Sequence, residues 1–173
     1  MSVTTELRNP ESAIEKLHVG YGGGRPLAPF AVLVSVWTFL FAAFLAISKA
    51  RGRPLPRLTL GDIVLLAGAT AHGARLLSKD AVMAPLRAPF TRYVEPGGPG
   101  EVNEEPRKES EAQHAIGELL TCPFCLATWV AALFTYGLGL APRFTRMVAG
   151  MFCAIGLANI FQLAYGTATK KAQ

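Results

Sequence analysis

Four long apolar runs, separated by short polar segments, limit what this chain can fold into. Residues 30–48, 119–140 and 147–165 contain no charged side chain, and residues 60–77 form a fourth, more polar run. A helix needs about 20 mostly apolar residues to cross the hydrocarbon core of a bilayer. Since irregular backbone cannot face lipid, the spans should be helical. We therefore predict an all-α, polytopic membrane protein whose four transmembrane helices form an antiparallel bundle.

The run at 60–77 is the weakest of the four, because it carries Asp62 near its start and His72 and Arg75 near its end. It is either a short span, with Arg75 reaching toward the headgroups, or a re-entrant or interfacial helix. The remaining segments are polar. They divide the chain into an N-terminal tail (1–29), a helical domain (30–166) with a polar loop (78–116), and a C-terminal tail (167–173).

Composition and charge agree with a membrane protein. Hydrophobic residues make up 51% of the chain and charged residues only 17%, against about a quarter in soluble domains. The net charge of +5 comes from Lys and Arg that flank the apolar runs, which is where membrane insertion favours them. They form no basic stripe with interleaved aromatic residues, so we expect no nucleic-acid partner.

The distribution of positive charge predicts an orientation in a bacterial cell membrane. With four spans, the side that holds both termini receives eleven Lys and Arg residues, and the other side receives six. Positive charge is enriched in cytoplasmic segments. We therefore predict a multi-pass protein of the cell membrane with both termini in the cytoplasm.

The motif Cys122-Pro123-Phe124-Cys125 is the sharpest candidate for chemistry. Two cysteines at this spacing share one face of a helix, and Pro123 restricts them to its first turn. Unpaired backbone N–H groups at that end favour a thiolate, which is the local chemistry of thiol–disulfide exchange. Zinc is a possible cofactor, with His114 or His72 as a further ligand. The alternative is that both thiols simply pack, and no cofactor is then needed.

Charged residues near the second run form another candidate cluster. Its members are His72, Arg75, Asp80, Arg87 and Glu118. Ionisable groups beside membrane helices are candidates for function, and each needs a partner. Arg75 is expected to pair with Asp80 or Glu118, and Arg87 to reach the interface or bind lipid phosphate. The other interpretation is that these charges anchor helix ends at the headgroups.

Small and polar residues predict where the helices touch. Small residues four apart allow two helix backbones to approach closely. Such rows are Gly150-x3-Ala154-x3-Ala158 and Ala69-x3-Gly73. Asn159 and Gln162 are expected to form hydrogen bonds across the bundle.

Three blocks of the sequence together resemble a family of small bacterial membrane proteins of unknown function that includes sporulation-associated YjcA-type proteins. The blocks are His72-x2-Arg75-Leu76-x3-Asp80, Leu86-Arg87-x-Pro89-Phe90 and Gly117-Glu118-Leu119-Leu120-x-Cys122-x2-Cys125-x3-Trp129. The resemblance covers roughly residues 60–165, so the first span and the N-terminal tail are additional. It implies a membrane protein and no defined activity.

These observations predict an integral membrane protein with a non-enzymatic accessory or structural role. It would act through the lipid bilayer, through other membrane proteins or through self-association. The alternative is a membrane thiol-redox or metal-binding protein that uses Cys122 and Cys125. Transport is a weaker third interpretation, because no apolar run carries a charged residue at its centre.

Overall fold

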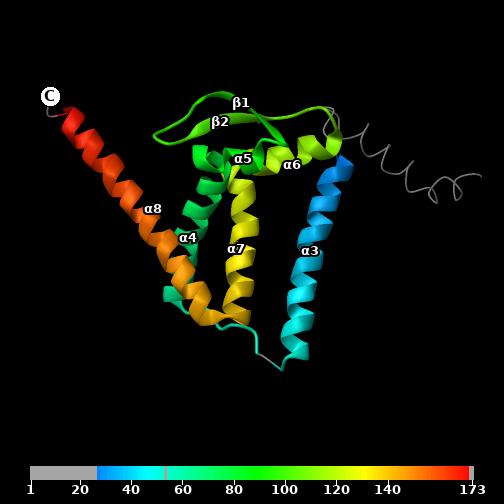
Figure 1. Ribbon diagram of the computed structural model, residues 1–173. Helices are drawn as coiled ribbons and strands as arrows, with labels where there is room; N and C mark the ends of the chain where they lie inside the picture. The colour runs from blue at the N-terminus through cyan, green and yellow to red at the C-terminus, as the bar shows by residue number, and fades with distance from the viewer. Residues whose placement is uncertain (1–26, 53, 172–173) are drawn as a thin grey trace, which may run out of the picture.

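The computed structural model describes residues 27–52 and 54–171, so most of the predicted N-terminal tail lies outside the described residues. The elements of this part follow one another in a simple order (Figure 1). They are α3 (Leu27–Ala50), α4 (Leu60–Lys79), the 3₁₀ helix η1 (Ala81–Met83), α5 (Ala84–Arg87), β1 (Thr91–Pro96), β2 (Val102–Pro106), α6 (Glu111–Thr121), α7 (Pro123–Leu140) and α8 (Pro142–Lys171).

Four of these helices, α3, α4, α7 and α8, are long and apolar enough to cross a membrane. They correspond to the four apolar runs of the sequence. Successive long helices alternate in direction, so the start of α3 and the ends of α4 and α8 all point toward the end of the molecule that holds β1 and β2 (Figure 1). Consecutive membrane crossings require this alternation, and an even number of them places the start of α3 and the end of α8 on the same side.

The run predicted to be weakest forms one continuous helix, α4, of 20 residues. Its early charge is accommodated at the helix start, where Thr59 and Asp62 form a reciprocal capping box. Asp62 also accepts a hydrogen bond from Arg146 of α8, with Nε and Oδ1 2.9 Å apart. Asp62 therefore caps α4 and ties it to α8.

The prediction of an all-α chain is wrong for the polar segment, which contains a two-stranded antiparallel sheet. β1 and β2 pair around a turn at Gly97–Gly100, where Gly100 adopts a positive φ of 76°. Within the predicted polar loop, Glu104 and Glu105 belong to β2. Arg92 lies directly opposite Glu105, and opposite charges in that position stabilise a strand pair.

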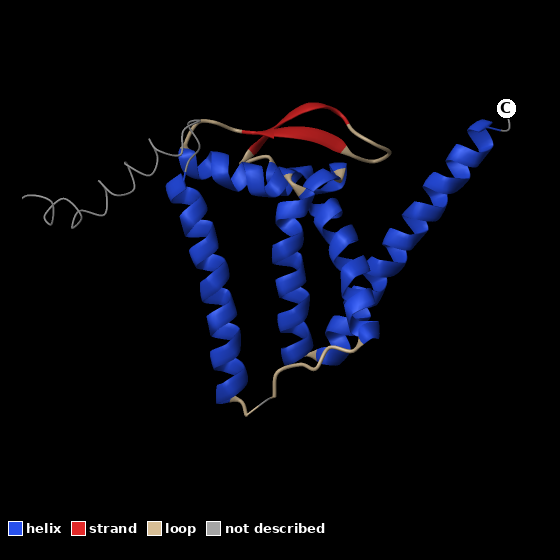
Figure 2. Cartoon of the chain, turned by 180° about the vertical axis from the view of Figure 1, so that it is seen from behind, coloured by secondary structure: helices blue, strands red, loops and turns tan. Residues whose placement is uncertain are grey.

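The third apolar run is shared by two helices. α6 ends at Thr121, and α7 begins two residues later at Pro123, the helix position that tolerates proline best. α6 lies across the ends of the long helices, beneath the hairpin (Figure 2). A Cβ on Gly117 of α6 would lie 2.5 Å from the Phe90 carbonyl oxygen and 2.9 Å from Pro106, so glycine allows this close approach.

The best-packed part of the molecule lies where α4 meets α7 and α8. Buried residues form two apolar clusters there: Leu66, Ala69, Leu138 and Ala149; and Ala74, Leu126 and Val130. The predicted contact row Ala69–Gly73 is confirmed, because Ala69 is fully buried and Gly73 faces Val130 and Phe152. At Gly68 an added Cβ would lie 2.5 Å from the sulfur of Cys153. Glycine and alanine thus bring α4 and α8 together.

The arrangement differs from a compact four-helix bundle. α3 stands to one side of the other long helices, and of its residues only Phe44 and Ser48 are buried (Figure 1). α8 buries only Thr145 and Ala149, and its later turns diverge from α4. Phe44 stacks on Tyr136 of α7 with ring centroids 4.8 Å apart, which joins α3 to α7.

The predicted contact face of α8 is wrong. Nothing lies within 4 Å of a Cβ placed on Gly150, and Ala154 and Ala158 are exposed. The contact to α4 comes instead from the side of α8 that carries Ala149 and Cys153. A small-residue row identifies a face that another helix can approach, and the neighbouring helix of this chain lies elsewhere.

Candidate functional site

The two cysteines of the CxxC motif lie side by side at the start of α7. Cys122 is the N-cap residue, and its sulfur accepts a hydrogen bond from the backbone N–H of Cys125 at 3.3 Å. The Cys125 thiol donates to the Cys122 sulfur, with the two Sγ atoms 2.7 Å apart. Both are free thiols. The prediction that these residues mark the start of a helix is confirmed.

The environment of Cys122 distinguishes it from an ordinary thiol. Partial burial raises its pKa, but hydrogen bonds from the Cys125 thiol and from the backbone N–H groups of Cys125 and Phe124, with the charge of Lys79, lower it further than burial raises it. The net effect is a pKa below the usual value of a thiol. Donors at a helix N-terminus stabilise a thiolate in this way.

Both thiols lie on the wall of a pocket of about 920 Å³. Side chains of α3, α6 and α7 form most of it, and Pro106 of β2 completes it. The lining residues are Leu27, Phe30, Leu33, Val34, Trp37, Pro106, Glu118, Leu119, Thr121, Cys122, Cys125, Thr128 and Trp129. We call this space the thiol pocket. Its walls are mainly aliphatic and aromatic, so it suits an apolar ligand that approaches the sulfur atoms.

A carboxylate shares the thiol pocket with the cysteines. Glu118 is one turn before Cys122 on α6, and its Oε1 lies 3.2 Å from Nε2 of His114. The two residues are four positions apart on the helix, which places them on one face. The sequence singled out Glu118 as a partner for Arg75, whereas the structure places it with His114 and the thiols. The i, i+4 spacing could have revealed this pair.

The structure gives no further metal ligands to the cysteine pair. In residues 27–52 and 54–171, no group of three or more His, Cys, Asp and Glu residues is arranged to hold a metal ion. His72, a predicted ligand, lies against α8, with its ring 6.0 Å from that of Phe152. Its Nε2 is buried and has no hydrogen-bond partner among the described residues. Zinc binding at Cys122 and Cys125 stays a prediction.

The predicted charged cluster is divided between separate contacts. Arg75 pairs with Glu101, at 2.5 Å and 2.8 Å, so the expectation that Asp80 or Glu118 would be its partner is wrong. Asp80 instead caps η1 by accepting a hydrogen bond from the Val82 N–H. The hairpin, which the sequence did not predict, supplies the partner of Arg75.

Arg87 is the most buried charged residue described, at 1% exposure, and it does not reach lipid phosphate as expected. Its Nε and Nη2 donate to the carboxylate of Glu104 at 2.9 Å and 3.0 Å. Its remaining hydrogen bonds go to the backbone oxygens of Leu77 and Asp80. Thr91 donates a third hydrogen bond to Glu104 at 2.7 Å. This network fixes β2 against the end of α4.

Burial and the hydrogen-bond partners of Glu104 shift its pKa in opposite directions. Burial raises the pKa of Glu104, whereas the hydrogen bonds from Arg87 and Thr91 and the charges of Arg87 and Lys79 lower it. The pKa lies below its usual value, so the carboxylate is ionised at neutral pH and the pair with Arg87 is charged on both sides.

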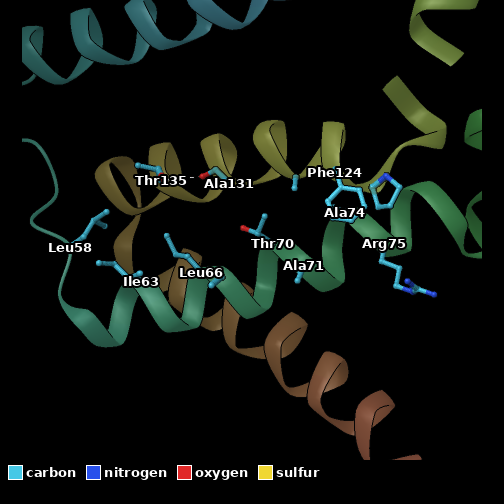
Figure 3. Close-up of a pocket in the computed structure, with 13 residues that line it drawn as sticks. Leu58, Ile63, Leu66, Thr70, Ala71, Ala74, Arg75, Phe124, Ala131 and Thr135 are labelled. Carbon is cyan, nitrogen blue, oxygen red and sulfur yellow. Dashed lines mark hydrogen bonds between the residues drawn. The ribbon is translucent and has the colours of Figure 1, made fainter. Parts of the chain in front are cut away.

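A second pocket, of about 620 Å³, lies between α4 and α7 (Figure 3). Small residues such as Thr70, Ala71 and Ala131 line it, with Arg75 and Phe124 at one end. It contains no thiol, carboxylate or imidazole group. The thiol pocket is therefore the better candidate for chemistry.

The fold and the site define a helical protein with four potential membrane spans and a dithiol beside an apolar pocket. Residues 65–165 match the family described as protein of unknown function DUF1360, and the chain belongs to this family. It is 33% identical over 103 residues to sporulation protein YjcA of Bacillus subtilis (strain 168), an alignment that covers 58% of this chain and 86% of that protein. No solved structure matches the chain.

The family match bears on the thiol pocket directly. It includes α6, α7 and both cysteines, but it begins after α3. One wall of the pocket, from Leu27 to Trp37, therefore comes from outside the matched region.

Proposed function

We propose that the protein is a non-enzymatic accessory or structural component of the bacterial cell membrane, in which α3, α4, α7 and α8 span the bilayer. The length and apolar character of these helices support the spans, and their alternating direction supports both termini on one side. The accessory role is exerted through lateral contact between helices.

The proposal of lateral contact rests on the outer face of α8. Asn159 and Gln162 are exposed, and neither side chain forms a hydrogen bond within residues 27–52 and 54–171. In hydrocarbon, an amide without a partner is unfavourable, and interhelical hydrogen bonds hold membrane helices together. Gln162 continues the row of Gly150, Ala154 and Ala158 at the same four-residue spacing. The face that allows close approach of another helix therefore also carries a polar side chain.

The occupant of this face is a second copy of the chain. An amide both donates and accepts, so Gln162 of one copy complements Gln162 of another. A row of small residues is likewise complementary to itself, as a two-fold symmetric contact requires. Such a dimer would place two α8 helices in contact and leave the α4 side of each unchanged.

The dimer is tested in liposomes of bacterial lipid by energy transfer between labelled copies, titrated against the protein-to-lipid ratio. We expect Ala154→Leu to weaken association at least tenfold, because a larger side chain separates the backbones. Gln162→Leu removes a hydrogen bond worth roughly 0.6 kcal/mol, which is about a threefold change. Ala46→Leu, on an exposed position of α3, is the matched control. A wild-type protein that stays monomeric at every ratio would overturn the second-copy assignment.

Thiol–disulfide chemistry at Cys122 and Cys125 is a second candidate function, and the 2.7 Å separation of the sulfurs favours it. With its pKa lowered, Cys122 should label with maleimide faster than an ordinary thiol does at the same pH, most clearly near pH 6, because more of it is thiolate. The comparison is made in Cys153→Ser protein, with Cys122→Ser as control. Equal, slow labelling of both variants across pH 6–8 would favour simple packing of the thiols.

A further inference from the structure

The thiol pocket is larger than two thiols require for packing alone. We propose that it binds a flat, lipid-soluble two-electron acceptor of the quinone class, and that Cys122 and Cys125 reduce this acceptor as they form a disulfide. This inference rests on the thiol–disulfide function and adds the chemical identity of the oxidant.

The lining of the pocket indicates the kind of molecule. Trp37 of α3 and Trp129 of α7 both line it, among aliphatic residues of the same helices. Aromatic side chains pack favourably against flat rings. The indole N–H of Trp37 is buried and has no hydrogen-bond partner among the described residues, and such a donor suits a carbonyl oxygen. A ring that carries carbonyl groups and an apolar tail combines these properties.

Cys122 and Cys125 lie where an acceptor bound in the thiol pocket would contact them. Both sulfurs belong to the pocket wall, and they are already 2.7 Å apart, so a disulfide needs little movement. The depressed pKa of Cys122 makes its sulfur the one that ionises first. Glu118 belongs to the same wall, with its carboxylate beside His114, and we assign it the role of proton acceptor.

The reaction balances without a further component. The two thiols lose two protons and two electrons and form one S–S bond. The quinone gains two electrons and two protons, and its two carbonyl groups become the hydroxyls of the hydroquinone. No oxygen atom is transferred and no metal takes part in the balance.

The test uses the purified full chain in lipid nanodiscs and a fully substituted benzoquinone with a ten-carbon tail. Such a ring has no free position at which a thiol can add permanently. Oxidation is followed as the loss of two maleimide-reactive thiols and of 2 Da per chain, with one hydroquinone formed. We expect this stoichiometry for wild type and for Cys153→Ser, whose changed residue lies outside the pocket, and no reaction for Cys122→Ser.

A variant that fills the pocket separates binding of the acceptor from reactivity of the thiols. Val34→Trp changes only α3, so the cysteine pair and its hydrogen bonds stay intact. We expect oxidation by the quinone to slow at least tenfold, with labelling by small maleimide unchanged. An unchanged rate with the quinone, or failure of wild type to reduce it, would overturn the proposal. Rapid oxidation of wild type by glutathione disulfide, without reaction with the quinone, would retain thiol–disulfide exchange and reject this acceptor.

Discussion

α4 is held by different kinds of interaction at its C-terminal end and along its length. At its C-terminal end, residues 80–121 form a cap of η1, α5, β1, β2 and α6, joined to α4 by ion pairs and hydrogen bonds centred on Arg87. Along its length, α4 meets α8 mainly through Gly68, Ala69 and Ala149. Lipid is as apolar as a leucine side chain, so helices within it are stabilised mainly by close packing against each other. In the cap, polar groups can replace hydrogen bonds to water with charge-assisted hydrogen bonds to one another.

The largest effect should come from breaking the buried pair in the cap. Arg87→Ala leaves Glu104 charged and buried without its main partner, which costs about 3–5 kcal/mol. Unfolding in mixed micelles, followed by circular dichroism, measures this loss. Arg87→Lys should recover only part of it, because an ammonium group cannot donate two parallel hydrogen bonds. A loss below about 1 kcal/mol for Arg87→Ala would show that the cap is not held by this pair.

A smaller effect should come from Gly117→Ala, which tests close packing inside the cap. The new Cβ would lie 2.5 Å from the carbonyl oxygen of Phe90, and backbone atoms cannot rotate away. We expect about 1–3 kcal/mol of destabilisation. Gly68→Ala is the matched change between helices: its nearest neighbour, at the same distance, is the Cys153 sulfur, which can move to another rotamer. Gly117→Ala should therefore be the more damaging, and the reverse order would contradict this reasoning.

The cap should also weaken in acid. The folded-state pKa of Glu104 is lowered, so its contribution to stability is fully present above its usual value of 4.5 and is lost as pH falls through the folded-state value. Wild type should lose stability relative to Glu104→Gln as the pH falls below the usual value of 4.5, measured by melting temperature in detergent. Parallel pH profiles for the two proteins would show that this carboxylate does not couple to folding.

The smallest effect belongs to the cross-strand pair of Arg92 and Glu105. Both side chains are largely exposed, and exposed ion pairs contribute little. Arg92→Ala should leave the melting temperature of the cap within experimental error in 0.15 M salt. A loss as large as that of Arg87→Ala would mean that the cap depends on its exposed charges as well.

The sequence predicts the parts of this fold that depend on local patterns. Apolar length identifies the four long helices, and Pro123 after Cys122 identifies the start of α7. Contacts that depend on distant residues leave no such pattern. Arg87 and Glu104 are 17 positions apart and belong to different elements, α5 and β2. The row on α8 shows which face carries small residues but not which helix contacts that face. Within the candidate site, the thiols and Glu118 were predictable individually, and the wall contributed by α3 was not.

The position of α3 before the family-matched segment has an evolutionary consequence. One wall of the thiol pocket is encoded outside the stretch of the chain that carries Cys122 and Cys125. Substitutions between Leu27 and Trp37 can change which molecule enters the thiol pocket and leave the reactive sulfurs untouched.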